Sequence, residues 1–141
     1  MGTISRNFSY REFEASQTAD LHQISNVIRD FRVRDAVYEL VVEVLQPLRD
    51  EWGAPLTINS GYRCEEVNKL VGGAPTSQHT TGEAADVACD NPCRLARLVI
   101  ELDLPFDQMI LYPTFVHISH KLNGEQRGQI LYNRSYKGPR V

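Results

Sequence analysis

Three side chains of this sequence, two histidines and one aspartate, are of the types that hold a catalytic zinc ion. Such an ion takes three protein ligands from His, Asp or Glu and leaves a fourth position for water or substrate. His79 and Asp86 share one short segment, and His117 follows later in the chain. Asp86 stands between Ala85 and Val87, where a buried carboxylate needs a partner such as a metal ion. The residue types alone leave an alternative open, in which both histidines are hydrogen-bonded core residues and Asp86 is a turn or salt-bridge carboxylate.

The helices that must support these side chains are predicted by the spacing of apolar residues. One long helix is predicted over Val33–Leu48, where apolar residues recur every three or four positions, with Gly53 at its C-cap and a kink at Pro47. A second is predicted over Pro92–Leu102. Shorter helices are expected after the capping box that begins at Ser9 and over 65–71.

The strands are predicted from short alternating or β-branched runs. They cover 56–60, 83–89, 106–111, 115–119 and 129–133, and the polar segment 74–82 is expected to be a loop. Asp86 then lies within one strand, His117 lies in the middle of another, and His79 lies at the edge of the loop. Helices followed by several strands close in sequence favour an α+β fold, with helices packed on a small, mainly antiparallel sheet.

The composition predicts one soluble globular domain over residues 1–141. Of the 141 residues, 42% are hydrophobic and 23% are charged, and a chain of this length can bury a stabilising core without disulfides. The formal net charge of -3 is spread along the chain without a basic cluster, so we expect no nucleic-acid partner. No apolar run approaches the ~20 residues of a membrane span, and we expect a monomer.

The N-terminal residues lack the apolar stretch and the small-residue cleavage site of a secretory signal. We therefore expect synthesis in the cytoplasm, with reduced thiols at Cys64, Cys89 and Cys93. A protein of this kind that acts outside the cytoplasm needs another route of export.

The ligand segment also resembles a known motif. Ser77, His79, Gly82, Ala84 and Asp86 reproduce the S-x-H-x-x-G-x-A-x-D pattern of the zinc D-Ala-D-Ala carboxypeptidase family, which includes the vancomycin-resistance dipeptidases and several phage endolysins. Other segments look like the family's S-G-Y-R turn, its second histidine strand and its compact M15A-like branch: Ser60–Arg63, Val116–Ser119, Leu45–Arg49 and Phe106–Gln108. The resemblance covers roughly residues 8–131.

The resemblance implies a fold of the D-Ala-D-Ala carboxypeptidase/hedgehog type with Zn²⁺ as its cofactor. His79, Asp86 and His117 would be the metal ligands. Arg63 would pair with a carbonyl or carboxylate of the substrate, for which a guanidinium fork is suited, and Ser77 would hydrogen-bond the substrate. From the residue alone, Arg63 is a surface arginine after a turn. The implied substrate is a peptidoglycan peptide that contains or ends in D-alanine.

The sequence departs from the family pattern at the general base. Family hydrolases place an Asp or Glu shortly before the second histidine, commonly three residues ahead, and Thr114 stands there. Asp107 is the nearest upstream carboxylate and our catalytic candidate, although a cap or strand-end role is the alternative. Glu83 faces the opposite side of the sheet if its strand is regular. Tyr112 is a candidate to donate a hydrogen bond to substrate.

Two functions from different classes follow from these residues. The first is a zinc metallopeptidase that acts on peptidoglycan peptides, as a D-alanyl carboxypeptidase or as an endolysin-type endopeptidase. A phage origin and delivery to the cell wall are part of this expectation. The second is a catalytically weak or inactive zinc-containing module that binds the cell wall or belongs to a phage tail. The missing carboxylate favours the second, and the complete ligand set opposes a purely structural domain.

Overall fold

A mixed five-stranded sheet forms the centre of the protein, in a computed structural model that describes residues 2–141. The strand order is β3-β4-β6-β5-β7. All neighbours are antiparallel except β5 and β7, which run parallel. The strands are β3 (Ile58–Ser60), β4 (Ala84–Ala88), β5 (Gln108–Leu111), β6 (Phe115–Ser119) and β7 (Gln129–Tyr132). The predicted α+β fold with a mainly antiparallel sheet is confirmed.

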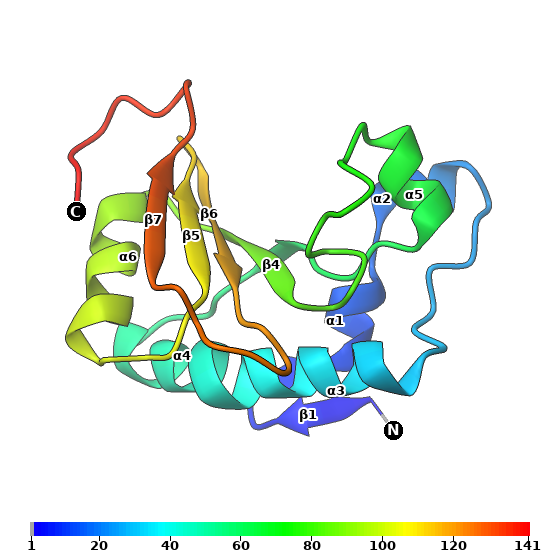
Figure 1. The fold of residues 1–141 in the computed structure, drawn as a ribbon, viewed down its shortest axis with the longest axis horizontal. Coiled ribbons are helices and arrows are strands. Elements are labelled where there is room, and N and C mark those ends of the chain that lie inside the picture. The colour runs from blue at the N-terminus through cyan, green and yellow to red at the C-terminus, as the bar shows by residue number, and fades with distance from the viewer. Residues whose placement is uncertain (1) are drawn as a thin grey trace.

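A continuous helical rod runs along one side of the sheet (Figure 1). It consists of α3 (Phe31–Leu40), a π-helical turn η1 (Val41–Leu45) and α4 (Gln46–Trp52). The kink predicted at Pro47 takes the form of this π turn, since a proline has no N–H to continue the regular α-helical bonding. Gly53 ends the rod in the left-handed conformation, as predicted.

The hydrophobic core lies between this rod, the sheet and α6 (Pro92–Glu101). Each of these elements contributes fully buried apolar side chains, among them Val37, Leu40, Val44, Leu48, Leu95, Val99, Val87, Met109, Val116 and Ile118. Successive strand residues point to opposite faces of a sheet. Because one set of alternate residues fills the core, the other set of β4, β5 and β6 faces away from it.

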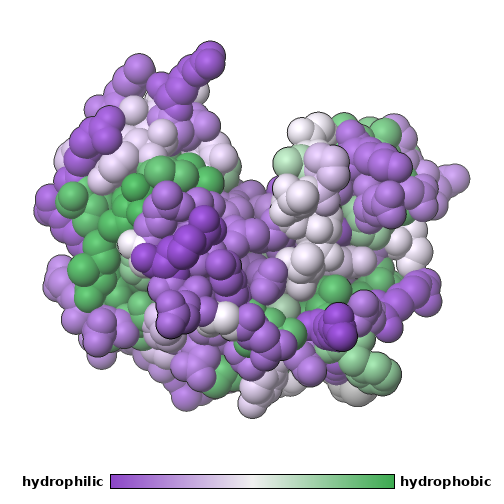
Figure 2. Space-filling model, viewed as in Figure 1, coloured by the Kyte–Doolittle hydropathy of each residue, from purple (hydrophilic) through white to green (hydrophobic). Residues whose placement is uncertain are grey.

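Helices on the opposite side create a second wall. Here α2 (Gln17–Leu21) contacts α5 (Glu65–Leu70), and Figure 1 places both across from β5, β6 and β7. Figure 2 shows a deep notch between this wall and the strands. The strand β4 crosses beneath the notch (Figure 1), so the cleft has the sheet on one side and two short helices on the other.

The N-terminal segment contains elements that the periodicity did not predict. A ribbon of β1 (Thr3–Ser5) and β2 (Phe8–Ser9) precedes α1 (Tyr10–Glu14). The capping box is confirmed, because the Ser9 N–H donates to Glu12 Oε1 at 2.9 Å. Among the described residues we find no helix with the length and hydrophobicity of a transmembrane span.

Gly82 and Gly53 allow a matched test of how the loop is held on the rod. Both have φ of +77°, but an added Cβ at Gly82 would lie 2.6 Å from the carbonyl oxygen of Val33 in α3, whereas one at Gly53 would meet nothing within 4 Å. We expect Gly53→Ala to lower the free energy of unfolding by about 1 kcal/mol through left-handed strain alone. Gly82→Ala should cost about 3 kcal/mol or more, since the backbone must also move. Urea denaturation measures both, and equal losses would contradict the prediction.

Candidate metal centre at the base of the cleft

Strand register places two of the predicted ligands side by side. Asp86 on β4 stands opposite His117 on β6, and His117 stands opposite Ile110 on β5. Directly opposed residues of antiparallel strands share one face of the sheet. All three side chains therefore lie on the face that the core does not use, and the pairing of β4 with β6 brings Asp86 and His117 together at the base of the cleft.

The third ligand, His79, comes from the loop before β4 and is held by the turn that contains Gly61. His79 Nδ1 lies 2.7 Å from the Gly61 carbonyl oxygen, and the Arg63 N–H donates to the His79 carbonyl at 3.1 Å. Gly61 itself rests on α1, because an added Cβ would lie 2.7 Å from Phe13 Cα. The absence of a side chain at Gly61 lets the turn approach α1 closely while its carbonyl faces His79.

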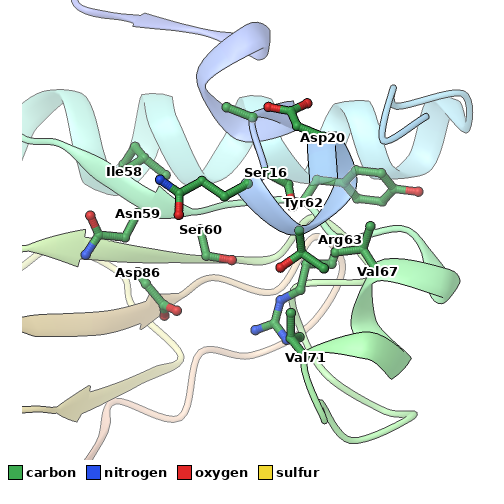
Figure 3. Close-up of a pocket in the computed structure, with 13 residues that line it drawn as sticks. Ser16, Asp20, Ile58, Asn59, Ser60, Tyr62, Arg63, Val67, Val71 and Asp86 are labelled. Atoms are coloured by element: carbon green, nitrogen blue, oxygen red, sulfur yellow. The ribbon is translucent and has the colours of Figure 1, made fainter. Parts of the chain in front are cut away.

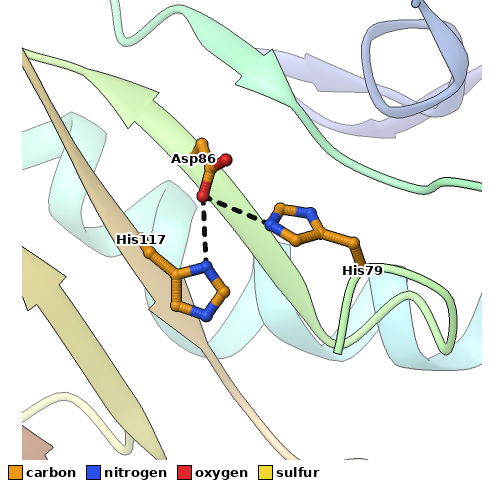
Figure 4. Close-up of side chains that lie close together, drawn as sticks. All are labelled: His79, Asp86 and His117. Atoms are coloured by element: carbon orange, nitrogen blue, oxygen red, sulfur yellow. Dashed lines mark hydrogen bonds and ion pairs between the residues drawn. The ribbon is translucent and has the colours of Figure 1, made fainter. Parts of the chain in front are cut away.

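The three side chains converge on one point (Figure 4). Asp86 Oδ1 lies 3.3 Å from His79 Nε2 and 3.1 Å from His117 Nδ1. One ligand atom from each residue lies within 4.8 Å of the others. Two imidazole nitrogens and one carboxylate oxygen form a donor set that suits Zn²⁺ and related transition metals, with a fourth position left open. The residues present therefore fit the metal that the family resemblance implies.

The electrostatic surroundings keep Asp86 ionised. Burial raises the pKa of its carboxyl group, but hydrogen bonds from His117 and His79 outweigh burial and hold the pKa well below its ordinary value. A carboxylate must be deprotonated to bind a metal ion. Asp86 is therefore in the ligand form at neutral pH.

The cleft consists of two hollows that meet at the metal cluster. One has a volume of about 710 Å³ and the other about 470 Å³, and both are lined by Arg63 and Asp86. Figure 3 shows the larger hollow, with β3 and Asp86 on one side and α2 and α5 around the rest. Both histidine ligands line the smaller hollow. A bound chain could thus contact protein on either side of the cluster.

Arg63 is fixed between the two hollows by Asn68. Arg63 Nη1 donates to Asn68 Oδ1 at 3.0 Å, and Asn68 Nδ2 donates to the Ala74 carbonyl at 2.8 Å. Gly73 leaves room for this contact, since its Cβ would lie 2.0 Å from Asn68 Oδ1. Arg63 Nε is buried and has no hydrogen-bond partner among the described residues. A fixed cation with an unused donor is suited to hold a carbonyl or carboxylate of a ligand.

Ser77 and Tyr112 line the smaller hollow together with the two histidines. Ser77 Oγ accepts the His79 N–H at 3.2 Å, so a bond from Ser77 to a ligand can use its O–H as donor. The ring of Tyr112 stacks on Phe115 with centroids 4.1 Å apart. Burial raises the pKa of Tyr112, and the charge of Asp86 adds to this effect. The phenol therefore stays protonated and can donate a hydrogen bond at neutral pH.

Asp107 lies beside the cluster without touching it. Its carboxylate is fully buried and accepts from Arg127 Nε at 3.1 Å, from Arg127 Nη2 at 2.8 Å and from Gln78 Nε2 at 3.1 Å. These bonds, with those to Arg127 first, lower the pKa of Asp107 to about 2. Gln78 Oε1 in turn lies 3.4 Å from His117 Nε2. Asp107 thus reaches the metal ligands through an intervening amide, and it lines neither hollow.

The other positions considered for a general base also lie outside the two hollows. Thr114 is exposed in the tight turn that joins β5 to β6, where the Tyr112 N–H donates to the Phe115 carbonyl. The Glu83 carboxylate accepts from Thr81 Oγ1 at 2.6 Å and from the Leu122 N–H at 2.9 Å. The acidic residues that line the hollows are Asp86 and Asp20.

Sequence reasoning missed several residues that shape this site. Asp20 on α2 lines the larger hollow, and the isolated short helix gave no signal. Asn26 is buried, and its amide donates to the carbonyls of Glu14 and Tyr62. Gln78 lies inside the recognised motif at a position that the pattern leaves variable. Its place between the motif residues Ser77 and His79 was the only feature of the sequence that could have pointed to Gln78.

Comparison with known families agrees with this geometry. A family model described as Peptidase M15 matches residues 6–119. The chain therefore belongs to the peptidase M15 family, a family of metal-dependent peptidases, and the matched residues include the three candidate ligands. A search of curated proteins found no match.

The ion pair between buried Asp107 and exposed Arg127 leads to a prediction about stability in acid. The pKa of Asp107 lies at about 2, below its ordinary value of 3.8, so its contribution is present above pH ~4 and is lost as pH falls towards 2. The contribution is about 2 kcal/mol. We expect the wild type to lose about that much more unfolding free energy between pH 5 and pH 2 than Asp107→Asn does. Urea denaturation at both pH values measures this difference. The other carboxylates titrate in both proteins, so an equal loss of unfolding free energy in wild type and Asp107→Asn would contradict the prediction.

Proposed function

We propose that this protein is a zinc-dependent peptidase that hydrolyses peptides of peptidoglycan. The observation that supports the proposal best is the convergence of His79, Asp86 and His117 at the junction of two hollows, with the Arg63 guanidinium beside them. Membership of the peptidase M15 family supports the same chemistry. A phage origin and delivery to the cell wall remain part of the proposal.

The residues around the cluster divide the work of binding and reaction. Bound zinc would polarise the scissile carbonyl and lower the pKa of the attacking water. Arg63 lines both hollows and binds a carbonyl or carboxylate of the substrate through its guanidinium N–H groups. Ser77 and Tyr112 donate hydrogen bonds from the wall of the smaller hollow. These contacts orient the peptide across the cluster, and orientation alone contributes strongly to rate.

The site is compatible with two kinds of peptide cleavage, which release different products. A D-alanyl carboxypeptidase would use Arg63 to hold the terminal carboxylate of its substrate. An endolysin-type endopeptidase would place residues of the substrate in both hollows, which meet at Asp86. The products formed from a defined peptidoglycan peptide distinguish them, because the first releases D-alanine and the second releases peptides.

A second function, a zinc-containing cell-wall-binding or phage tail-associated module with weak or no hydrolysis, is favoured by one observation. Among the described residues, the only carboxylates that line the hollows are the ligand Asp86 and Asp20 on α2. A general base must come within hydrogen-bond reach of the water it deprotonates, directly or through one water. Asp107 instead holds Arg127 and Gln78 with its carboxylate.

The proposed function is tested by zinc content and peptidoglycan digestion measured on the same preparations. We expect about one zinc per wild-type chain and release of peptide or D-alanine that a chelator abolishes. His117→Ala should lose both while its circular dichroism spectrum stays native, because a core of this size does not need the metal to fold. His22→Ala, at an exposed histidine, is the matched control. Wild-type protein that binds zinc but digests nothing supports the binding module instead.

Substitutions can test which position would place a general base beside the metal site. Tyr112 is the residue after β5 and lines the smaller hollow, whereas Thr114 is exposed in the turn and lines neither hollow. If no carboxylate acts as base, we expect Tyr112→Glu to raise kcat on a D-alanine-containing peptide by ~10-fold or more. Thr114→Glu should leave kcat nearly unchanged. A larger gain from Thr114→Glu than from Tyr112→Glu would contradict this assignment.

A further inference from the structure

We infer that Gln78 is a positioning residue that determines which ring nitrogen of His117 faces the metal ion. The Gln78 side chain bridges two groups: its Oε1 lies 3.4 Å from His117 Nε2, and its Nε2 donates to Asp107 Oδ2 at 3.1 Å. The inference rests on the proposed metal site and concerns how one ligand of that site is oriented.

The chemistry of Asp107 fixes the direction of the Gln78 amide. An ionised carboxylate can only accept hydrogen bonds. Asp107 is fully buried and is held as a carboxylate by the two side-chain bonds from Arg127. Gln78 must therefore turn its NH₂ group towards Asp107. Its carbonyl oxygen is then the end that faces His117.

The amide oxygen in turn selects one tautomer of His117. An oxygen that accepts from His117 requires the N–H to be on Nε2, and a neutral imidazole carries a single N–H. When a metal ion is bound, the lone pair is then on Nδ1, the nitrogen that lies 3.1 Å from Asp86 Oδ1. The ion takes the place of the proton that makes the hydrogen bond to Asp86 in the metal-free site. A second group that bonds the outer nitrogen of a ligating histidine orients the ring and raises its basicity. Gln78 does this for His117.

His79 is oriented by a different device, which makes Gln78 distinctive. His79 Nδ1 lies 2.7 Å from the carbonyl oxygen of Gly61, which can only accept. The N–H of His79 is therefore on Nδ1, and Nε2 faces Asp86 at 3.3 Å. The two histidines thus present opposite nitrogens to the metal position. Only the orientation of His117 depends on a side chain that a substitution can remove.

The contacts form a relay that runs from His117 through Gln78 and Asp107 to Arg127. Arg127 anchors its far end. Besides its two side-chain bonds, its backbone N–H donates to Asp107 Oδ1 at 3.0 Å. The Lys121 ammonium lies 3.8 Å from the same oxygen. Arg127 lies beyond residues 6–119, which the family model matches. The relay thus runs from the motif segment into a part of the chain that the family match does not cover.

Zinc affinity tests the role of Gln78 directly. We expect Gln78→Leu to weaken zinc binding ~10- to 100-fold, as loss of a partner to a ligating histidine does, measured by competition with a chromophoric chelator. Gln129→Leu, at an exposed position on β7, is the matched control and should bind as the wild type does. Circular dichroism shows whether each variant is folded. A Gln78→Leu affinity within threefold of wild type overturns the inference.

Substitution of Asp107 separates a relay from a general base. Asn at position 107 can donate as well as accept, so the Gln78 amide is free to turn and zinc affinity should fall ~10-fold. Asp107→Asn should have no further effect in the Gln78→Leu background, because the two residues act in series. Additive losses of affinity, or lost turnover with unchanged zinc affinity, overturn the relay.

The ring nitrogens can be assigned in ¹⁵N-labelled protein loaded with ¹¹³Cd²⁺. Scalar coupling of the metal to His117 Nδ1 and His79 Nε2 is the expected result. Coupling to His117 Nε2 overturns the inference while leaving the metal site intact. Wild-type protein that binds neither zinc nor cadmium instead removes the proposed function, and the inference with it. The two failures are therefore distinguishable.

Discussion

A negative charge at the base of the cleft is the constraint around which this protein is arranged. Asp86 is largely buried on β4, and its carboxylate is faced by two imidazole rings. A buried charge is costly unless it is paired or coordinates a metal ion. The β4–β6 register supplies His117, and the turn at Gly61 supplies the carbonyl that orients His79. The sheet, the loop and α1 are thus all required at one point.

Much of the fold was predictable because its signals are local. The capping box at Ser9, the left-handed C-cap at Gly53 and the disturbance near Pro47 each depend on a few neighbouring residues. The β1–β2 ribbon and α2 were missed because elements of two to five residues are too short to show a period. The metal ligands were predicted from the family motif, because the residue types alone left a non-metal role for them open.

The relay behind His117 could not have been read from the sequence. Gln78, Asp107 and Arg127 lie on three separate segments, and no spacing rule connects them. Asp107 was considered as a base because it is the nearest upstream carboxylate. The fold buries that carboxylate and gives it an arginine partner, and a group held in this way is suited to orient its neighbours. Side-chain direction, and not residue type, separates these two roles.

The seating of Gly61 on Phe13 has a consequence for the order in which the site assembles. The Tyr62 N–H donates to the Phe13 carbonyl at 2.8 Å, and Gly61 has no room for a side chain against α1. The carbonyl that orients His79 is therefore held in place by the N-terminal helix. The ribosome makes α1 long before the strand that carries His117, so the helix is present before the Gly61 turn packs on it. A metal ion can therefore be bound by all three ligands only after α1, the Gly61 turn and the strand that carries His117 have come together.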